Sequence, residues 1–527
     1  MRRMQFAAAA LLVLLLSTPA AALGQARVVT GTITSNLDGE PVVGVSVRLK
    51  GALQATESDG AGQYRMEVPA GSSETLTFSH EEHDYREVEI AGRARVDVVL
   101  VSRMRFNQYG VKVERMPVDA EERGGFLVLE SPDQSYKFWF DMRVQVDGAV
   151  FMGEQYNSIG NGVAVRRARI AAKAQMTENW YGEIDMDFAD SRADLKDAYV
   201  AYTNGPFMWR VGNFKETFSM ETNTTSRYLV FMERPEVTRL FTPSRHLGTQ
   251  VAYDFSRFLV AGGVHFQDVG GWEEVQVRKD NNSALGQSEG YSFTGKLVYM
   301  PFLNDERGLH LGAAASYRTP KTTDQLNAVR FDVRTNTSIN RKKFLDTDRI
   351  QNVSHYTFRG LEGAAFWRNL RVQGEYNLAD VHRNDDLASA SFDGFYVLGS
   401  ALLFGGRHRY NPGEGEFTQP SRGRSWGDVE LAARYAYLNL TDADAGIYGG
   451  AGEVLTLGLN FHVNNNVKFM VNYGINNHDR YANGRNRLFA GTDANGNPTT
   501  NFQAVTQPKG KGGEDYQMLS VRFEVNF

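Results

Sequence analysis

The sequence predicts an all-β protein: an antiparallel transmembrane β-barrel of about sixteen strands that follows a small β-sandwich domain. Three observations predict this fold class. Segments of roughly ten residues with alternating apolar and polar side chains recur from Tyr136 to the last residue. Some connections between them are tight and others are long and polar, which is typical of a membrane barrel. After the N-terminal region, no apolar run is long enough for a membrane-spanning helix.

The composition narrows the classes of function. The chain has 527 residues, a formal net charge of −5 and a pI of about 6.1, so nothing global favours nucleic acid as a partner. It contains no cysteine, which excludes disulfides and thiolate metal sites. The 52 glycines and the aromatic content of 12% suit turns and strands better than helices. No cofactor is expected.

Residues 1–26 are predicted to be a secretion signal. Two arginines precede an apolar run over 6–16, and small residues follow. A transmembrane anchor is disfavoured because the run is shorter than the ~20 residues that a spanning helix needs. Cleavage is expected between Ala22 and Arg27, so the protein is predicted to leave the cytoplasm.

Residues 27–101 read as short strands separated by Asp-Gly and Pro-Ala-Gly turns, which predicts a β-sandwich of about seven strands. The stretches "GTITSNLDGEPVVGVSVRLKG" and "GQYRMEVPAG" resemble a carboxypeptidase-regulatory-like domain. Such domains often precede outer-membrane barrels, especially in the Bacteroidota, and the resemblance implies no peptidase activity. Residues 102–135 are expected to form a linker and a lead-in strand.

Two motifs of this chain look like metal sites but are better explained as structure. His80-Glu81-Glu82-His83 is one residue shorter than the zinc motif His-Glu-x-x-His, and its context is strand and turn rather than helix. The stretch 442–446 resembles a fragment of a calcium loop without the remaining ligands. No nucleophile elbow, phosphate-binding loop or catalytic carboxylate pair is recognisable, so the sequence predicts that the protein is not an enzyme.

The barrel is predicted over residues 136–527. An even number of strands brings both of its ends to one rim, and about sixteen strands leave an aqueous lumen. The predicted strands lie near 136–150, 163–176, 180–189, 195–202, 207–214, 248–255, 258–267, 290–301, 308–318, 355–366, 369–381, 392–404, 427–440, 453–463, 467–475 and 515–527.

The last predicted strand closes the barrel. Its apolar side chains, from Leu519 to Phe527, alternate with polar ones, as expected for a strand between lipid and water. A final Phe527 resembles the signal that the bacterial barrel assembly machinery recognises. The alternative is a large soluble protein of several sandwiches, but charged residues on nearly every strand would then have to enter a dry core.

The segment 207–250, "FMWRVGNFKETFSMETNTTSRYLVFMERPEVTRLFTPSRHLGTQ", carries the most specific resemblance. Together with "RRARI" at 166–170 and "DAYVAY" at 197–202, it is similar to the phosphate-selective porins O and P. The resemblance extends over about residues 125–527. It implies a sixteen-stranded barrel, usually a homotrimer, in the outer membrane of a Gram-negative bacterium, with residues 216–247 folded inward as a constriction loop.

The implied function is passive diffusion of small anions, phosphate or polyphosphate, through a lining of Arg and Lys. Arg offers a planar fork to a phosphate group and Lys a mobile charge, so rings of both are expected in an anion pore. The N-terminal domain would then lie in the periplasm. The resemblance implies the following anion-binding residues: Lys215, Ser219, Arg227, Arg166 and Arg167.

Strand parity adds Arg169 to these anion-binding residues. Alternation along 163–176 predicts that Arg167 and Arg169 face the lumen, whereas Arg166 faces lipid unless it lies at the rim. Further along the chain, Arg330 and Arg334 share one face of an extended stretch. They are candidates for a ladder of cations at the channel entrance, together with Arg341, Lys342 and Lys343, although an ordinary solvated loop is an equally good interpretation.

Carboxylates leave the selectivity open. The segment 215–246 contains Glu216, Glu221, Glu233 and Glu236, and the third strand adds Glu183, Asp185 and Asp187 to the lumen. Thr217 also replaces the proline that the family has at this place. The alternatives are a porin of mixed or other selectivity, or a surface or adhesion barrel whose sandwich domain binds a periplasmic partner.

Overall fold

The computed structural model describes residues 26–114, 119–123, 126–154, 159–191, 193–266, 290–321, 327–341, 343–479, 491–499, 504, 506 and 515–527. The chain divides into two compact units, Met1–Val118 and Asp119–Phe527. The predicted signal segment lies outside the described residues, apart from its last position. In the described ranges, no helix is long and apolar enough to cross a membrane.

Within residues 27–101 of the first unit, seven strands form two small sheets, ordered β4–β1–β7 and β3–β2–β5–β6. Both sheets contribute to one hydrophobic core, in which Ile33, Leu76 and Phe78 are fully buried. The number of strands agrees with the predicted sandwich. The hairpin of β8 (Met104–Phe106) and β9 (Lys112–Glu114) follows. The seven strands are β1 (Arg27–Ser35), β2 (Ser46–Leu49), β3 (Ala55–Glu57), β4 (Gln63–Val68), β5 (Thr75–His80), β6 (His83–Glu89) and β7 (Val98–Leu100).

His80 and His83 are paired across β5 and β6, and their Nδ1 atoms lie 3.0 Å apart. Burial, and then the neighbouring His80, lower the pKa of His83 below its ordinary value. A zinc protease motif needs one helical turn between its histidines. The strand context therefore agrees with the structural interpretation of this motif.

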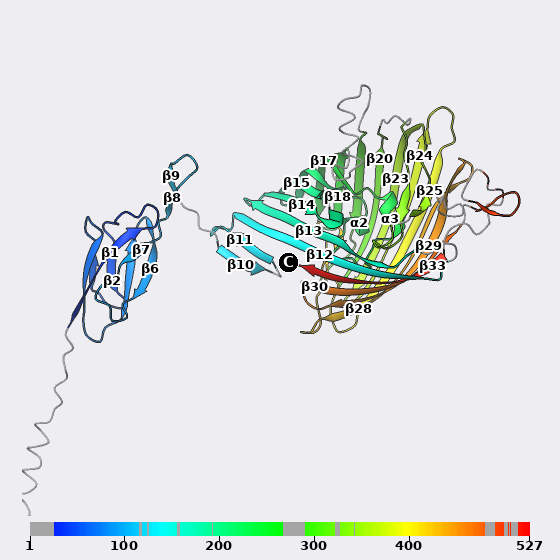
Figure 1. Cartoon of the computed structure of the whole chain (residues 1–527). Coiled ribbons are helices and arrows are strands. Elements are labelled where there is room, and N and C mark those ends of the chain that lie inside the picture. Colours follow the sequence, from blue (N-terminus) through cyan, green and yellow to red (C-terminus); the bar gives the residue numbers. More distant parts are fainter. Residues whose placement is uncertain are drawn as a thin grey trace, which may run out of the picture. The chain divides into compact units, whose positions relative to one another are not determined.

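Sixteen strands of the second unit form a closed antiparallel barrel, in which the last strand pairs with the first (Figure 1). All sixteen predicted strands are present. They are β12 (Tyr136–Met152), β13 (Gly162–Met176), β14 (Trp180–Asp187), β15 (Asp194–Asn204), β16 (Phe207–Lys215), β17 (Arg245–Phe255), β18 (Phe258–His265), β19 (Ser292–Tyr299), β20 (Arg307–Arg318), β23 (Val353–Trp367), β24 (Leu370–Arg383), β25 (Ala390–Leu402), β28 (Asp428–Asp442), β29 (Ile447–His462), β30 (Val467–Asp479) and β33 (Asp515–Asn526).

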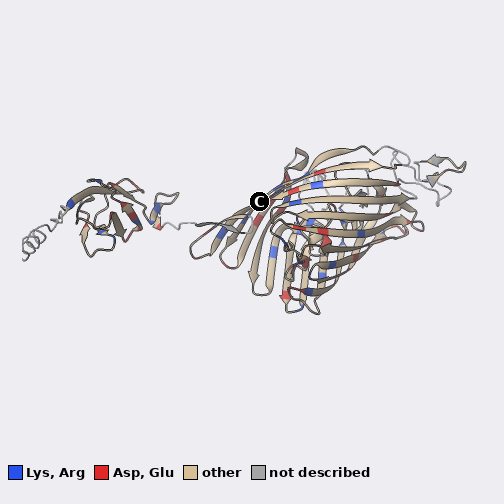
Figure 2. Ribbon diagram, turned by 90° about the horizontal axis from the view of Figure 1, so that it is seen from below, with Lys and Arg blue, Asp and Glu red and all other residues tan. Residues whose placement is uncertain are grey.

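Alternation along each strand separates the two faces of the wall. On β33, Ser520, Arg522 and Glu524 are buried inside, whereas Val521 and Phe523 are 49% and 41% exposed on the outer face. Figure 2 shows Lys, Arg, Asp and Glu distributed along many of the barrel strands. The outer face is therefore apolar and the inner face polar, as a barrel in lipid requires.

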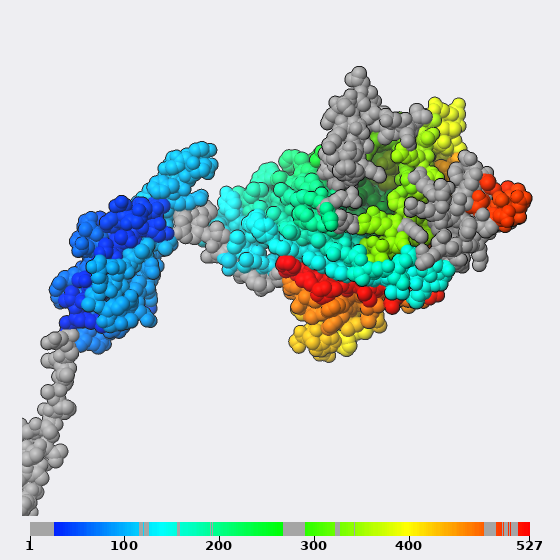
Figure 3. Space-filling model, viewed as in Figure 1, coloured from blue at the N-terminus to red at the C-terminus, as the bar shows by residue number. Residues whose placement is uncertain are grey.

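A short hairpin extends the first barrel strand. β10 (Asp119–Arg123) pairs with β11 (Phe126–Glu130), and β11 pairs with the first residues of β12. β33 takes over the same edge of β12 from Arg143 onward. The backbone N–H of Phe527 donates to the carbonyl of Met142 at 3.0 Å, which completes the pairing. Figure 3 shows the red C-terminal strand against the cyan β12. The predicted lead-in strand is thus a hairpin.

The rim that carries Tyr136 and Phe527 is called the terminal rim, and the other one the distal rim. Four terminal-rim turns are very short: 177–179, 205–206, 256–257 and 368–369. The connection 403–427 is an exception to the short turns that the barrel pattern predicts on this rim. Among the connections that the structure describes over most of their length, 216–244 and 319–352 are also long, and both start from the distal rim.

Candidate functional site

The first inward segment, residues 216–244, folds into the lumen, as the resemblance implied. It contains two short helices, α2 (Met220–Asn223) and α3 (Glu236–Phe241). α3 packs against the inner faces of β24, β25 and β28. Its apolar residues Val237 and Phe241 are fully buried in a cluster inside the barrel. Hydrophobic burial therefore holds this segment against one side of the wall.

Ion pairs and charged hydrogen bonds hold the first inward segment at its start and at its apex. At the start, Glu216 is fully buried and binds Arg318, with both N–O distances 3.0 Å. At the apex, Arg522 donates to the carbonyl of Met232 at 2.7 Å and binds Asp147 through two hydrogen bonds of 2.6 and 2.7 Å.

Glu233, next along the apex, forms an ion pair with Arg166, in which Nη2 donates to Oε2 at 3.0 Å. Burial by itself would raise the pKa of Glu233. The ion pair with Arg166, with help from Arg167 and Arg522, nevertheless holds this pKa well below its usual value. Glu233 is therefore charged at neutral pH, and its charge is neutralised by the wall.

The second inward segment, 319–352, packs on the first. Its described part contains β21 (Asp332–Arg334) and β22 (Lys343–Asp346), which pair with each other. Phe331 and Leu345 join the cluster around α3. The Arg239 guanidinium donates to the carbonyls of Arg334 and Thr335 at 3.0 and 3.1 Å. The two segments thus form one packed body inside the barrel.

The predicted ladder of cations lies on this second segment. Arg330 is paired with Asp332 and Asp346, and Lys343 with Asp332. Lys342 lies outside the described residues. Arg330, Arg334 and Arg341 are not among the described side chains that line the cavity between the first inward segment and β12 to β18. These residues therefore do not belong to the cavity wall, and a ladder of cations at the channel entrance stays a prediction.

The third inward segment, 403–427, enters from the terminal rim and was missed by sequence reasoning. It contains β26 (Tyr410–Asn411) and β27 (Glu416–Phe417). The Tyr410 hydroxyl is hydrogen-bonded to His310. The Arg371 guanidinium lies 3.7 Å from the centre of the Phe417 ring, and Phe417 is 1% exposed. A signal was available, because Gly and Pro are dense here and would interrupt any strand.

The first and third inward segments and the barrel wall enclose a cavity of about 600 Å³, which is called the central cavity. Its walls are the inner faces of β12 to β18, the first inward segment and residues 411–418. Among the described residues, nine basic and six acidic side chains line it. The basic ones are Arg143, Arg167, Arg169, Lys173, Arg210, Lys215, Arg227, Arg234 and Arg245, and the acidic ones are Asp141, Glu183, Asp185, Asp197, Glu414 and Glu416.

Four of the basic side chains are neutralised locally. Two of the pairs are short: Lys173 with Asp141 at 2.8 Å and Arg245 with Asp197 at 2.6 Å. Arg169 binds Asp187 at 3.0 Å, and Arg227 is paired with Asp141. The other five form no ion pair with any described residue. They donate hydrogen bonds to neutral oxygen atoms or lie over an aromatic ring. These five are Arg143, Arg167, Arg210, Lys215 and Arg234.

The structure therefore brings together most of the residues that the sequence predicted. Lys215 lines the cavity and donates to the carbonyl of Asn223 at 2.8 Å. Arg227, Arg167 and Arg169 line it as well. Ser219 does not: it is 1% exposed and caps α2 by accepting a hydrogen bond from the Thr222 N–H at 3.0 Å. Its role is to shape the loop rather than to offer a donor.

Arg166 corrects the parity argument. The β12–β13 register changes at this place, because Gln145 faces Arg167 whereas the next residue, Val146, faces Val165. Arg166 is thus the extra residue of a β-bulge. Its side chain reaches Glu233 of the first inward segment instead of lipid. Arg166 and Arg167 therefore both point inward, the first as an anchor and the second toward the cavity.

Sequence reasoning missed Arg143 and Arg210 as cavity residues, and it placed Arg234 and Arg245 only within the constriction segment 215–246. Arg143 and Arg210 could have been found from inward parity on their strands, where each alternates with outward apolar residues. Arg234 and Arg245 depend on the path of the first inward segment. Their position therefore needed the structure.

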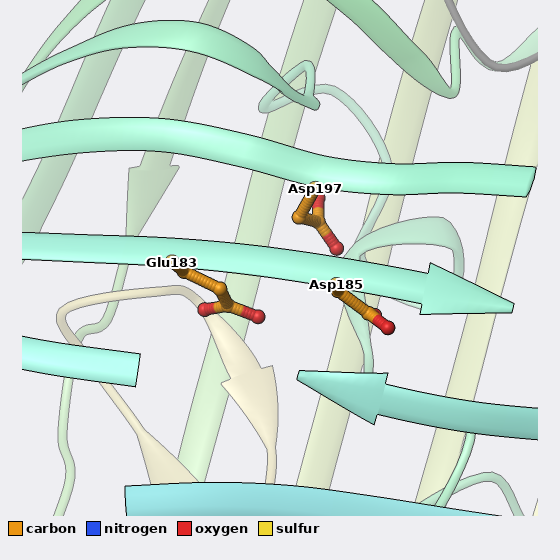
Figure 4. A group of neighbouring side chains, drawn as sticks. All are labelled: Glu183, Asp185 and Asp197. Carbon is orange, nitrogen blue, oxygen red and sulfur yellow. The ribbon is translucent and has the colours of Figure 1, made fainter. Parts of the chain in front are cut away.

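Glu183, Asp185 and Asp197 form an acidic cluster on β14 and β15 (Figure 4). One oxygen from each lies within 4.8 Å of the others. Each carboxylate also has a cation within ion-pair distance: Lys173 for Glu183, Arg169 for Asp185 and Arg245 for Asp197. These cations occupy the space around the oxygens, so the cluster is better explained as part of a charge network than as a metal centre.

Glu416 differs from the other cavity carboxylates. It is 5% exposed, and burial, followed by the repulsion of Glu414, raises its pKa well above the usual value. Its protonated form is uncharged. The net positive charge of the cavity therefore depends on pH through this residue.

We expect anion preference to increase as the pH falls through the raised pKa of Glu416, because protonation removes a negative charge from the cavity. Reversal potentials in a KCl gradient at a series of pH values would measure this. Glu416→Gln should show the low-pH preference at every pH. Glu178→Gln, on an exposed terminal-rim turn, is the matched control. An unchanged pH profile in Glu416→Gln would contradict the expectation.

The chain is similar in sequence to one protein family and to individual proteins of other bacteria. The family described as phosphate-selective porin O and P matches residues 138–495. An uncharacterized protein of Caulobacter vibrioides is 27% identical over 353 residues, which cover 66% of this chain and 69% of that protein. The TonB-dependent receptor P3 of Formosa agariphila is 36% identical over 76 residues, 14% of this chain and 8% of the receptor.

Among solved structures, the anion-selective porin from Comamonas acidovorans has a TM-score of 0.47 at 12% identity, covering 74% of this chain and 100% of that one. The outer membrane channel DcaP of Acinetobacter baumannii has a TM-score of 0.44 at 10% identity, covering 76% and 99%. The family match spans most of the barrel, and the chain therefore belongs to the phosphate-selective porin O and P family: it is an outer-membrane porin, a channel rather than an enzyme.

Proposed function

We propose that this porin gives passive passage to small anions, including phosphate, through the central cavity. The observation that carries the proposal is the set of five cations without a carboxylate partner. Each would replace part of the hydration shell of a passing anion, as Arg and Lys do in anion pores. Diffusion down a gradient needs no cofactor.

The charge balance of the cavity favours anions. The lining holds nine basic and six acidic side chains, an excess of three positive charges when all are ionised. Burial and the repulsion of Glu414 raise the pKa of one of the acidic ones, Glu416. Low-dielectric walls strengthen the field of such an excess. Anions should therefore concentrate in the cavity, and small cations should be repelled.

The phosphate preference rests on the chemistry of the donors. Arg227 and Arg167 provide planar guanidinium groups, and Lys215 provides a point charge on the wall of the same cavity. Such a set can bind several oxygens of one phosphate group. The family to which the chain belongs is described as phosphate-selective.

The orientation and the assembly of the porin in the outer membrane are also part of the proposal. The terminal rim is proposed to face the periplasm, with the N-terminal unit on that side, and Phe527 is proposed to be read by the barrel assembly machinery. A homotrimer is proposed as the assembled form, as the resemblance implied.

The acidic half of the cavity wall favours a second candidate, a porin of mixed selectivity. Six carboxylates line the cavity within the part of the chain that the structure describes. If their charge were not cancelled by the ion pairs, small cations would pass as well. The measurement below separates the two.

Planar-bilayer recordings of the purified porin test the proposal. We expect a reversal potential that shows anion preference, and a chloride current that phosphate blocks in a saturable way. Lys215→Ala and Arg227→Ala should each weaken the phosphate block by roughly tenfold, because each removes one charged hydrogen-bond donor.

Arg257→Ala is the matched control, because Arg257 is exposed on the turn 256–257 and does not line the cavity. It should leave block and reversal potential unchanged. Cation preference in the wild type would instead support mixed selectivity. The absence of any phosphate effect would remove phosphate from the proposal.

A further inference from the structure

The central cavity has an apolar wall as well as a cationic one. Ala201, Met208, Ala252 and Leu259 line it, and they lie near the terminal-rim ends of β15 to β18. Behind them, Leu259 and Ala252 pack with Val298 and Met300 in a buried cluster. This part of the wall is therefore held by a core and cannot easily rearrange to expose polar groups.

Aromatic rings continue the apolar wall. Trp139, Tyr181, Tyr199 and Phe214 follow one another on the inner face, with ring centres 6.0, 5.9 and 6.0 Å apart. Tyr181 and Tyr199 line the cavity, and their hydroxyls donate to Glu183 at 2.7 and 3.2 Å. These hydrogen bonds fix the rings, which are thereby preorganised as a contact surface.

The unpaired cations lie next to this surface. The Arg210 guanidinium is 4.7 Å from the centre of the Tyr199 ring and 5.3 Å from that of Phe214. Lys215 follows on the same strand, and Arg234 lies on the first inward segment. The cavity thus offers positive charge at one part of its wall and aromatic and aliphatic surface at another.

The size of the cavity fits the same idea. A volume of about 600 Å³ lies within the range of about 300–1,000 Å³ that is typical of sites for organic molecules. An inorganic phosphate ion could use the cations but would leave the apolar wall in contact with water. That wall is explained if the solute itself has an apolar part.

We infer that the cavity selects organic anions, in which a phosphate or carboxylate group binds the unpaired cations and an aromatic or other apolar body lies on the Tyr181–Leu259 side of the wall. This inference rests on the proposed function, because it uses the same cations. It adds a second determinant of selectivity that acts on the body of the solute rather than on its charge.

Two phosphate esters of equal charge test the inference. Phenyl phosphate and methyl phosphate carry the same anionic group and differ in their apolar body. In planar-bilayer recordings, phenyl phosphate is expected to block the chloride current at a concentration about tenfold lower than methyl phosphate does, since burial of one face of the ring adds to the shared ionic contact.

Met208→Gln removes apolar character at nearly constant size. It should reduce the advantage of phenyl phosphate, expressed as the ratio of the two blocking concentrations, to about twofold. The ratio is the readout, because Met208 also contacts the Arg210 guanidinium and its replacement can shift the block by both esters together. Met176→Gln is the matched control, because Met176 is 39% exposed and does not line the cavity. Ala252→Ser is a second, smaller change on the same wall. A chloride conductance close to that of the wild type shows that the variant barrel is folded.

The outcomes separate the inference from the proposed function. If both esters block equally and Met208→Gln changes nothing, the inference is wrong while the anion channel stands. If neither ester blocks and the current prefers cations, the proposed function is wrong and the inference falls with it. A phenyl phosphate advantage that survives both wall variants would also overturn the inference, because the ring would then bind elsewhere.

Discussion

Arg522→Leu is expected to destabilise the folded barrel by about 3–5 kcal/mol, because it removes one partner of a buried ion pair. Asp147 is 1% exposed and would lose both of its hydrogen bonds to Arg522. The carbonyl of Met232 would lose its donor as well. The apex of the first inward segment would then be free to move, so the single-channel current should also become larger and noisier.

Urea unfolding of the reconstituted protein, followed by tryptophan fluorescence, would measure the stability change. Arg407→Leu is the matched control, since it removes an exposed ion pair with Glu306 on the terminal rim. That pair should contribute no more than about 1 kcal/mol. Equal effects of the two variants would contradict the anchoring role of Arg522.

Replacing Arg210, Lys215 and Arg234 together by glutamine is expected to abolish anion preference. None of these three side chains forms an ion pair with a described residue, so their replacement breaks no ion pair of a carboxylate. The lining would then hold equal numbers of basic and acidic side chains. Because selectivity follows the excess charge of the lining, the reversal potential in a KCl gradient should move close to zero.

The control for this triple variant carries the same change of charge on the terminal rim. Arg257, Arg307 and Arg407 are exposed there and do not line the cavity. Their replacement by glutamine should shift the reversal potential only slightly, and less at high salt, because exposed charges are screened. A triple cavity variant that kept its anion preference would show that the unpaired cations do not set selectivity.

The barrel could be predicted from the sequence because its signal is local and repeated. On β33, each outward Val or Phe alternates with an inward polar residue, and this pattern states which face meets lipid without any knowledge of neighbouring strands. The short turns add the same information at each strand end. All sixteen strands were therefore accessible to simple reasoning about period and length.

Arg166 shows where parity fails. A β-bulge adds one residue to β13 opposite β12, and the inward and outward positions along β13 are reversed on its two sides. The bulge depends on pairing between two strands, which a pattern along one strand does not contain. The sequence therefore predicted the right pair of arginines but assigned Arg166 to the wrong face.

The inward segments were harder still. Residues 319–352 and 403–427 look like polar connections, yet Phe331 and Phe417 are buried inside the barrel. The partners that bury them, such as Phe241 and Arg371, are far away in the sequence. Which cations of the cavity remain unpaired is likewise decided by contacts between distant strands and loops, so charge counts along the sequence left the selectivity open.

The packing of three chain segments inside the barrel also has an electrical consequence. Resistance to ion flow grows with the length of a passage and falls with its cross-section, so the narrowest part of a pore dominates the total. Here the inward segments fill part of the space that the sixteen strands enclose, and the central cavity lies between β12 to β18 and two of these segments. The conductance of this pore therefore depends on the free cross-section that the inward segments leave, and it should be lower than that of an open barrel with the same number of strands.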